Sequence, residues 1–288
     1  MASDMNGDMN GEINTPTERP LGDKRSGPKA RSAWAVTRSV WYAMFIREAI
    51  GRTMTDRMGW FWMVLEPFAM VALMVGIRSF IKGDRLIVNA PFIPWMITGL
   101  MGFYLLRDGM TRGMSAVKAN QALFTYRQVQ TTDPVIVRIF LDGMLRTFVL
   151  ILFICIGGLL GLELYPDNVV RSFFSWFSLW SLGLGLGLTL SALATLVEEI
   201  EKIVKLTSLP LIIISGVMFP LNHLPHWLLE YAMINPIPHG LETLRLGFFE
   251  NYHVVKGTSE LYLWAFILGT NALGLMLHIR FSHKLKAQ

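Results

Sequence analysis

Charged residues inside apolar segments are the side chains of this sequence with the greatest capacity for chemistry. Glu66 lies within an apolar segment and precedes Pro67, which removes one helical backbone donor. A carboxylate at that depth must be paired or wetted, so we expect it at the headgroup layer or beside a polar cavity. Asp142 and Arg146 are four residues apart, the spacing at which helical side chains form ion pairs. Two further pairs share this spacing, Glu198 with Lys202 and Glu201 with Lys205.

Motifs for nucleotide binding, metal binding and nucleophilic catalysis are absent from the sequence. No G-x-x-x-x-G-K-[ST] loop, H-E-x-x-H, C-x-x-C or G-x-S-x-G pattern occurs. We therefore expect no catalytic, cofactor or metal site in this chain. His223, His226 and His239 leave a metal site open as an alternative, although solvated or backbone-bonded histidines fit their segment better. His278 is expected to be structural.

The composition is that of a membrane protein. Of the 288 residues, 52% are hydrophobic and 16% are charged, against about 25% charged residues in an average soluble domain. These values exclude an ordinary soluble enzyme and a disordered chain. The single cysteine, Cys155, excludes an internal disulfide. Gly183, Gly187 and Ser191 recur every four residues, which predicts a small-residue face for close helix packing.

The hydropathy pattern predicts an all-α integral membrane fold with six transmembrane helices. The six spans are expected at about Trp60–Ile81, Pro91–Leu106, Phe140–Leu162, Phe173–Val197, Leu206–Phe219 and Leu261–Ile279. Arg107 and Asp108 are expected to close the second span at the cytoplasmic boundary. The fifth span is too short for a hydrocarbon core of ~30 Å, so it is expected to turn back. Residues 221–234 and 238–250 are predicted to form two short helices in the outer leaflet.

The distribution of lysine and arginine predicts that both termini are cytoplasmic. With six spans, nineteen basic residues fall on the side of the termini and five on the other side, as the positive-inside rule requires. The net charge of +5 therefore reflects cytoplasmic loops, and we expect no nucleic-acid partner. Residues 1–33 are predicted to be a disordered cytoplasmic tail, and residues 34–288 to be one transmembrane domain.

Residues 34–52 are predicted to form a helix that lies in the headgroup layer. At 100° per residue, one face of this helix carries aromatic residues together with Arg38 and Arg52. Two interpretations remain open. The helix is either an anchor with snorkelling arginines or a surface that receives an anionic, lipid-linked substrate. The residues of this candidate access surface, continuing into the first span, are Arg38, Trp41, Phe45, Arg52, Arg57, Trp60, Trp62 and Glu66.

The loop at 107–139 is basic and cytoplasmic in this topology. Residues Ala116–Tyr126 are predicted to form a helix whose apolar side chains, Leu123, Phe124 and Tyr126 among them, are exposed unless something covers them. Docking into a groove of another protein would cover them. The alternative is that they pack against the spans of this chain.

Three stretches resemble a known family. They are TDRMGWFWMVLEP (55–67), ITGLMGFYLLRDGMTRGMSAVKANQALFTYRQVQTTDPVIVR (97–138) and SGVMFPLNHLPHWLLEYAMINPIPHGLETLRLGFF (215–249). Over residues 34–285 the chain resembles the membrane subunit of type-2 ABC exporters, most closely the Kps-type permeases that export capsular polysaccharide in Gram-negative bacteria.

The resemblance implies a homodimer in the bacterial inner membrane with two cytoplasmic ABC ATPase subunits, which hold the ATP and Mg²⁺. It further implies an acidic glycan substrate on a lipid carrier and a periplasmic co-polymerase or adaptor. Residues 34–52 would be the interface helix. The coupling helix would use Lys118, Asn120, Gln121, Leu123, Phe124, Tyr126 and Arg127. The periplasmic gate would use Pro220, His223, Trp227, Asn235, Pro236, His239 and Arg245.

Two other functions stay open on the sequence. The first is a type-2 exporter permease for O-antigen or for another lipid-linked or small substrate. The second is a channel or scaffold without an ATPase, which the apolar cytoplasmic segment disfavours.

Overall fold

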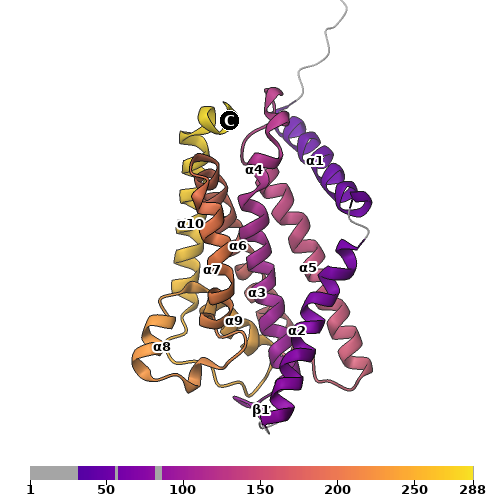
Figure 1. The fold of residues 1–288 in the computed structure, drawn as a ribbon, viewed down its shortest axis with the longest axis vertical. Coiled ribbons are helices and arrows are strands. Elements are labelled where there is room, and N and C mark those ends of the chain that lie inside the picture. Colours follow the sequence, from indigo (N-terminus) through magenta and orange to yellow (C-terminus); the bar gives the residue numbers. More distant parts are fainter. Residues whose placement is uncertain (1–31, 56–57, 82–85, 288) are drawn as a thin grey trace, which may run out of the picture.

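The computed structural model describes residues 32–55, 58–81 and 86–287, and the fold is almost wholly helical (Figure 1). The long helices are α1 (Ala33–Thr55), α2 (Gly59–Ile81), α3 (Phe92–Met114), α5 (Asp133–Leu159), α6 (Val169–Leu196), α7 (Glu199–Ile214) and α10 (Glu260–Arg280). The shorter helices are α4 (Ala116–Ala119), α8 (His226–Ala232), α9 (Pro236–Phe248) and α11 (Ser282–Ala287), with 3₁₀ turns at Gln121–Thr125 and Leu221–His223. The predicted tail lies outside the described residues, except for Ser32 and Ala33.

Helices α3 and α6 form the centre of the bundle, and their backbones touch. Gly183 and Gly187 of α6 face Gly109 of α3, where an added Cβ would meet backbone atoms. Ser191, one turn further along α6, is fully buried. The small-residue packing face predicted from the sequence is confirmed, because only residues without large side chains permit this approach.

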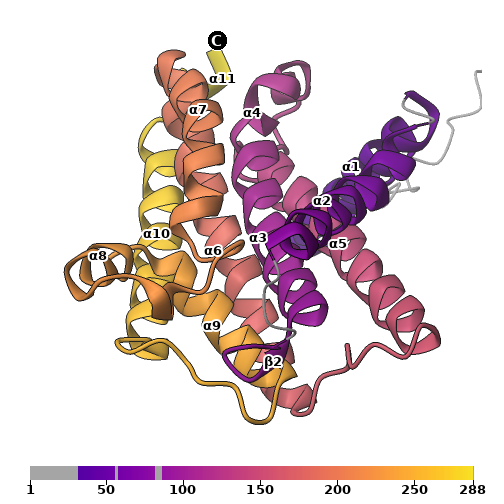
Figure 2. The ribbon, with the colours of Figure 1, turned by 60° about the horizontal axis from the view of Figure 1, so that its bottom comes forward.

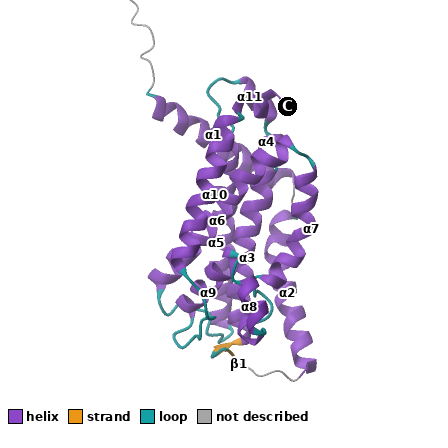
Figure 3. Ribbon diagram, turned by 90° about the vertical axis from the view of Figure 1, so that its left-hand side faces the viewer, coloured by secondary structure: helices purple, strands orange, loops and turns teal. Residues whose placement is uncertain are grey.

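The other elements surround this centre. Helices α5, α9 and α10 pack on α3 or α6, whereas α1 lies at the edge beside α5 (Figures 1 and 2). Helix α4 and the C-terminus lie at one end of the bundle, and α8, α9 and a short hairpin lie at the other (Figures 1 and 3). The hairpin pairs β1 (Leu86–Ile87) with β2 (Ala90–Pro91) in antiparallel fashion.

Among the described residues, three helices are long and apolar enough to cross a membrane: α5, α6 and α10. A shorter apolar stretch, Val64–Ile77, lies within α2. Helix α3 corrects the sequence prediction, since it does not end at Leu106 but continues through Arg107 and Asp108 to Met114. The helix can continue because both charges find partners on other helices.

The fifth predicted span is also shifted. Helix α7 is Glu199–Ile214 rather than Leu206–Phe219, so it starts in the charged segment and stops sooner. Sixteen residues rise about 24 Å, less than the ~30 Å of a hydrocarbon core. The chain then turns at Gly216, whose φ of 71° favours glycine.

Two short helices follow this turn, as the sequence predicts, but with different bounds. Helix α8 covers His226–Ala232 instead of 221–234, and α9 covers Pro236–Phe248 instead of 238–250. Asn235 starts α9, because its side-chain oxygen accepts a hydrogen bond from the Ile237 amide at 3.1 Å and Pro236 occupies the first turn. Helix α9 is buried along almost its whole length.

The contact between α3 and α6 predicts a specific sensitivity to one methyl group. In Gly187→Ala the added Cβ would lie 2.6 Å from the Gly109 carbonyl oxygen, so the helices must separate. We expect a loss of about 1–3 kcal/mol in the free energy of unfolding. Gly158→Ala is the matched control, because its Cβ meets nothing within 4 Å. Thermal unfolding in detergent measures both variants, and equal melting temperatures would contradict the packing role.

Candidate functional site

Helix α1 is fastened to the rest of the chain near its middle by two hydrogen bonds. The Trp41 indole Nε1 donates to Asp133 Oδ1 at 2.8 Å, at the start of α5. Arg47 donates to the side-chain oxygen of Asn120, which lies between α4 and the following 3₁₀ turn. The bond from Arg47 connects the predicted interface helix directly to the predicted coupling segment, and the bond from Trp41 connects it to α5.

The second half of α1 is held by ion pairs. Arg138 Nε of α5 donates to Glu48 Oε1 at 2.8 Å, and Arg52 donates to Asp142 of α5. Arg112 of α3 also approaches Asp142, with Nη1 3.6 Å from Oδ1. Burial raises the pKa of Glu48, but the hydrogen bond from Arg138 and the neighbouring guanidinium charges outweigh burial, so this pKa lies below its ordinary value.

A second ionic cluster joins α2, α3 and α5. Arg107 Nη2 donates to Glu66 Oε1 at 3.0 Å, and Arg146 Nε donates to Asp108 Oδ2 at 2.6 Å. The ring of Tyr104 lies between the two guanidinium groups, at 4.6 Å from that of Arg107 and 5.0 Å from that of Arg146. Of the two states left open for Glu66, paired or wetted, the structure shows the paired one.

The expected pairing of Asp142 with Arg146 is wrong. Although both residues are on α5, Asp142 pairs with α1 and Arg146 pairs with α3. A partner on another helix compensates for burial of the charge better than a solvated neighbour on the same helix. Of the other expected pairs, Lys205 contacts Glu201 at 2.7 Å, whereas Glu198 contacts Lys118 at 3.2 Å.

The predicted coupling helix at 116–126 is not continuous. Helix α4 ends at Ala119, Asn120 has a φ of −123°, and a 3₁₀ turn follows. The Asn120 side chain causes this break, because its Nδ2 donates to the Ala116 carbonyl at 2.8 Å while its oxygen accepts from Arg47.

The apolar side chains of this segment divide into two groups. Phe124 packs in a buried cluster with Met44 of α1, Val135 of α5 and Leu285 of α11. For Phe124 the alternative of packing against this chain's own helices therefore holds. Tyr126 is 65% exposed. The remaining polar residues of the predicted set, Lys118, Gln121 and Arg127, are half-buried or exposed, and Leu123 is half-buried.

The described members of the predicted access set differ in exposure and in partners. Arg38 and Trp62 are exposed. Arg52 and Glu66 are already bound to partners, as is Trp41. The ring of Phe45 lies 6.3 Å from that of Phe140. Arg57 and the side chain of Trp60 lie outside the described residues.

At the opposite end of the bundle, the predicted gate residue Arg245 is completely buried. Its guanidinium stacks 3.7 Å from the centre of a Trp95 ring and donates from Nη1 to Glu242 Oε1 at 3.0 Å. It also donates to the Gly216 carbonyl at 3.0 Å, immediately after α7. Arg245 therefore joins α9 to α3 and to the turn that ends α7.

Glu242 is the centre of this group, and sequence reasoning missed it. The Tyr252 hydroxyl donates to Glu242, with contacts of 3.1 Å to Oε1 and 3.0 Å to Oε2. Trp95 Nε1 donates to the same hydroxyl at 3.2 Å. Burial raises the pKa of Tyr252, so its phenol stays neutral and keeps donating. The signal in the sequence was Glu242 and Arg245 at i,i+3 within an otherwise apolar helix.

The histidines of this end do not form a metal site among the described residues. His239 is buried, accepts at Nδ1 from the Ser259 amide at 2.9 Å and donates from Nε2 to the Met233 carbonyl at 2.8 Å, which confirms the backbone-bonded interpretation. His223 and Trp227 are exposed, and Pro220 is half-buried. His278 is buried beside Ser191 and Thr131, as expected of a structural residue.

Comparison with known proteins gives one family and several relatives. The family described as ABC-2 type transporter matches residues 39–249. The chain is 31% identical over 249 residues to the polysialic acid transport protein KpsM of Escherichia coli, covering 86% of this chain and 96% of that protein. It is 28% identical over 267 residues to the capsule polysaccharide export inner-membrane protein BexB of Haemophilus influenzae, covering 93% and 99%. It is 26% identical over 215 residues to the corresponding protein CtrC of Neisseria meningitidis serogroup B, covering 75% and 81%.

The ion pairs that hold α1 can be tested by replacing one charged side chain with an uncharged side chain of the same shape. Asp142→Asn removes the buried carboxylate that Arg52 and Arg112 share, while Arg52 keeps Glu48 at 3.5 Å. We expect a destabilisation of about 1–3 kcal/mol, the cost of removing one partner of a buried hydrogen bond. Glu198→Gln removes an exposed pair with Lys118 and should cost less than about 1 kcal/mol. Thermal unfolding in detergent compares the two, and a similar shift in both would show that the Asp142 contacts do not hold the helix.

Proposed function

The chain belongs to the ABC-2 type transporter family, and we propose that it is the membrane subunit of an ATP-driven exporter that moves lipid-linked, acidic capsular polysaccharide across the bacterial inner membrane. The observation that carries the proposal is similarity over most of the chain to proteins named for polysialic acid transport and capsule polysaccharide export. The alignments cover 81–99% of those three proteins, so the likeness extends over whole permeases.

In this proposal six helices serve as membrane spans: α2, α3, α5, α6, α10 and the short α7, which ends before the turn at Gly216 without crossing the whole hydrocarbon core by itself. Both termini are cytoplasmic, which puts α4 and α11 inside the cell and α8 and α9 at the periplasmic face. The excess of basic residues on the side of the termini supports this orientation. A periplasmic signal from a reporter fused after Gln288 would contradict it.

Two copies of the chain form the transport path. The support is the outward surface of α2 and α7, whose large apolar side chains find no cover in one copy. Exposed residues there include Phe61, Phe68, Leu73 and Ile77 on α2, and Leu206, Leu209, Ile213 and Ile214 on α7. These helices also have few neighbours within the chain, in contrast to α3 and α6. A path for a polymer lined by both copies would use this surface.

Two ABC ATPase subunits bind the cytoplasmic end, and they hold the ATP and Mg²⁺ that the reaction consumes. Tyr126 and Arg127 are exposed beside a buried anchor, Phe124, and this arrangement suits docking. Asn120 of the same segment is bonded to Arg47. A displacement of the segment by an ATPase would therefore pass to α1 and, through Arg52 and Asp142, to α5.

The predicted access and gate residues divide into exposed residues and residues that hold helices together. Exposed Arg38 and Trp62 are the access residues that remain free to meet a lipid-linked acidic glycan, whereas Arg52 and Glu66 hold helices in place. The buried group around Glu242 and Arg245 holds the gate helices. A periplasmic co-polymerase or adaptor is proposed to dock on their outer surface.

The proposed function is tested by deleting the gene in its source bacterium and complementing it with the wild-type chain. We expect the surface capsule to disappear and a lipid-linked acidic glycan to accumulate inside the cell, because synthesis continues without export. Surface staining and extraction of intracellular glycan provide the measurements. An unchanged capsule in the deletion strain would refute the assignment.

The docking role of the coupling segment predicts a difference between two exposed tyrosines. Tyr126→Ala, combined with Arg127→Ala, should lower the amount of co-purified ATPase by about tenfold and reduce export in proportion, since hot-spot residues dominate such interfaces. Tyr165→Ala is the control, because Tyr165 is similarly exposed but lies in the loop between α5 and α6, away from α4. A Tyr126 variant that retains its ATPase fully would place the docking surface elsewhere.

A further inference from the structure

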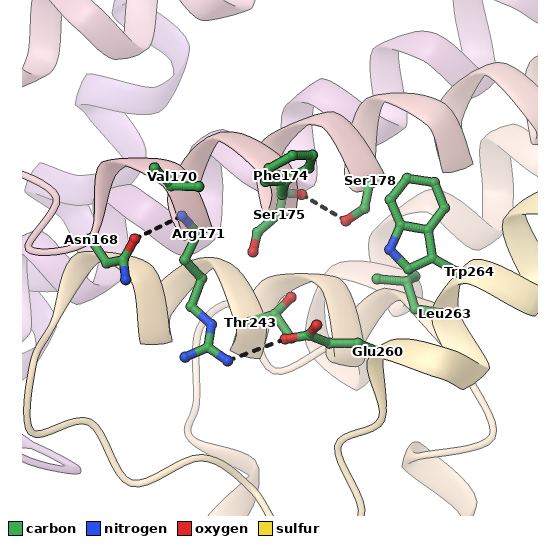
Figure 4. Close-up of a pocket in the computed structure, with 10 residues that line it drawn as sticks. All are labelled: Asn168, Val170, Arg171, Phe174, Ser175, Ser178, Thr243, Glu260, Leu263 and Trp264. Carbon is green, nitrogen blue, oxygen red and sulfur yellow. Dashed lines mark hydrogen bonds and ion pairs between the residues drawn. The ribbon is translucent and has the colours of Figure 1, made fainter.

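A cleft of about 570 Å³ lies where α6, α9 and α10 meet, at the end of the bundle opposite α4 (Figure 4). Arg171 in the first turn of α6 and Glu260 at the start of α10 stand on its two sides. None of the roles proposed above for docking, access or gating uses this cleft.

The charged groups of the cleft are paired but still accessible. Arg171 Nη2 lies 3.5 Å from Glu260 Oε1, and the two side chains are 45% and 57% exposed. At this distance and exposure the pair is weak, so a ligand with two charges can replace it by binding each partner separately. The cleft therefore offers one cation and one anion side by side.

A hydroxyl inside the cleft is available to a ligand. Ser175 is only 6% exposed, and its side-chain oxygen points into the cavity in Figure 4. Ser178 differs, since its hydroxyl donates to the Ser175 carbonyl at 2.8 Å. An oxygen atom of a ligand in the cleft would accept a hydrogen bond from the Ser175 hydroxyl.

The remaining walls are apolar and belong to membrane-spanning helices. Val170 and Phe174 on α6 are exposed, and Leu263 and Trp264 on α10 complete the surface. Since α6 and α10 are both long and apolar enough to cross a membrane, their first turns lie near the headgroup layer. The ring of Trp264 also lies 6.3 Å from that of Phe177, so the aromatic surface continues along α6 toward the membrane interior.

We propose that this cleft binds one phospholipid with a phosphoethanolamine headgroup. The phosphate is bound by the Arg171 guanidinium and the ammonium by the Glu260 carboxylate. The Ser175 hydroxyl donates to a phosphate or ester oxygen. One acyl chain lies along Phe174 and Trp264. A saccharide with only negative charges fits less well, because Glu260 would face it and the walls are largely apolar.

The consequence for the protein is that a lipid bridges α6 and α10 at their first turns. The inference depends on the helices crossing a membrane and does not depend on the identity of the exported substrate. Its failure would leave the proposed function untouched.

The experiment is lipid retention by the full chain in detergent, measured by native mass spectrometry with dioleoylphosphatidylethanolamine or dioleoylphosphatidylglycerol added. The wild type should retain phosphatidylethanolamine about tenfold more than phosphatidylglycerol, since one charge-assisted hydrogen bond distinguishes them. Glu260→Gln should abolish this preference, and Arg171→Gln should lower retention of both lipids. Glu163→Gln, an exposed carboxylate outside the cleft, is the control and should behave as wild type.

Equal retention of the two lipids by the wild type, or an unchanged preference in Glu260→Gln, would overturn the proposal. Ser175→Leu fills the cleft and keeps both charges. We expect this variant to lose phosphatidylethanolamine, and that loss would support the site even if a charge variant fails to fold. Soluble glycerophosphoethanolamine that binds as tightly as the lipid would show a free phosphate site instead. Displacement of the lipid by oligosialic acid would show a saccharide site instead, and either result overturns the proposal.

Discussion

A buried charge in an apolar helical bundle must find a partner within the protein, because apolar surroundings cannot solvate it. Arg146 of α5 and Asp108 of α3 meet this constraint between two helices at 2.6 Å. Arg245 of α9 meets it across elements through the carbonyls of Gly216 and Val217 after α7, and the Trp95 ring of α3 lies 3.7 Å away. Each contact forms only when the helices have one particular register. The charges therefore stabilise the arrangement only in the correct fold, and they hold α3 against its neighbours near both ends.

The arrangement separates a rigid centre from elements held at few points. The rigid centre is α3 and α6, whose glycines allow backbone contact. Helix α1 lies outside this centre and is attached through polar groups, from Trp41 near its start to Arg52 near its end. Polar side chains can exchange their hydrogen-bond partners one at a time. Separating two closely packed backbones instead breaks many contacts at once. If residues 116–127 couple to an ATPase as proposed, their motion is expected to pass through α1, with α3 and α6 as the fixed reference.

At the end of the bundle that carries α8 and α9, a group of buried polar side chains holds the chain in place. Asn235 and Pro236 start α9, and the buried Glu242 collects hydrogen bonds from Arg245 and Tyr252. Since Trp95 of α3 contacts both Arg245 and Tyr252, this end is also anchored to the central helix. A broken backbone inside a packed bundle is stable only when its polar groups are satisfied by the surrounding protein. Here buried side chains satisfy them.

Composition and periodicity alone determined that the chain is a helical membrane protein. They also determined the packing face at Gly183 and Gly187 and the two short helices near the end, because these features depend on neighbours within one segment. Only the tertiary structure decided the partners of Asp142, the break at Asn120 and the convergence on Glu242. Asp142 and Arg146 have ideal helical spacing, yet each pairs elsewhere. Periodicity specifies which side chains share a face of one helix, whereas the energy of a pair depends on the distance between helices, and that distance exists only after the helices pack.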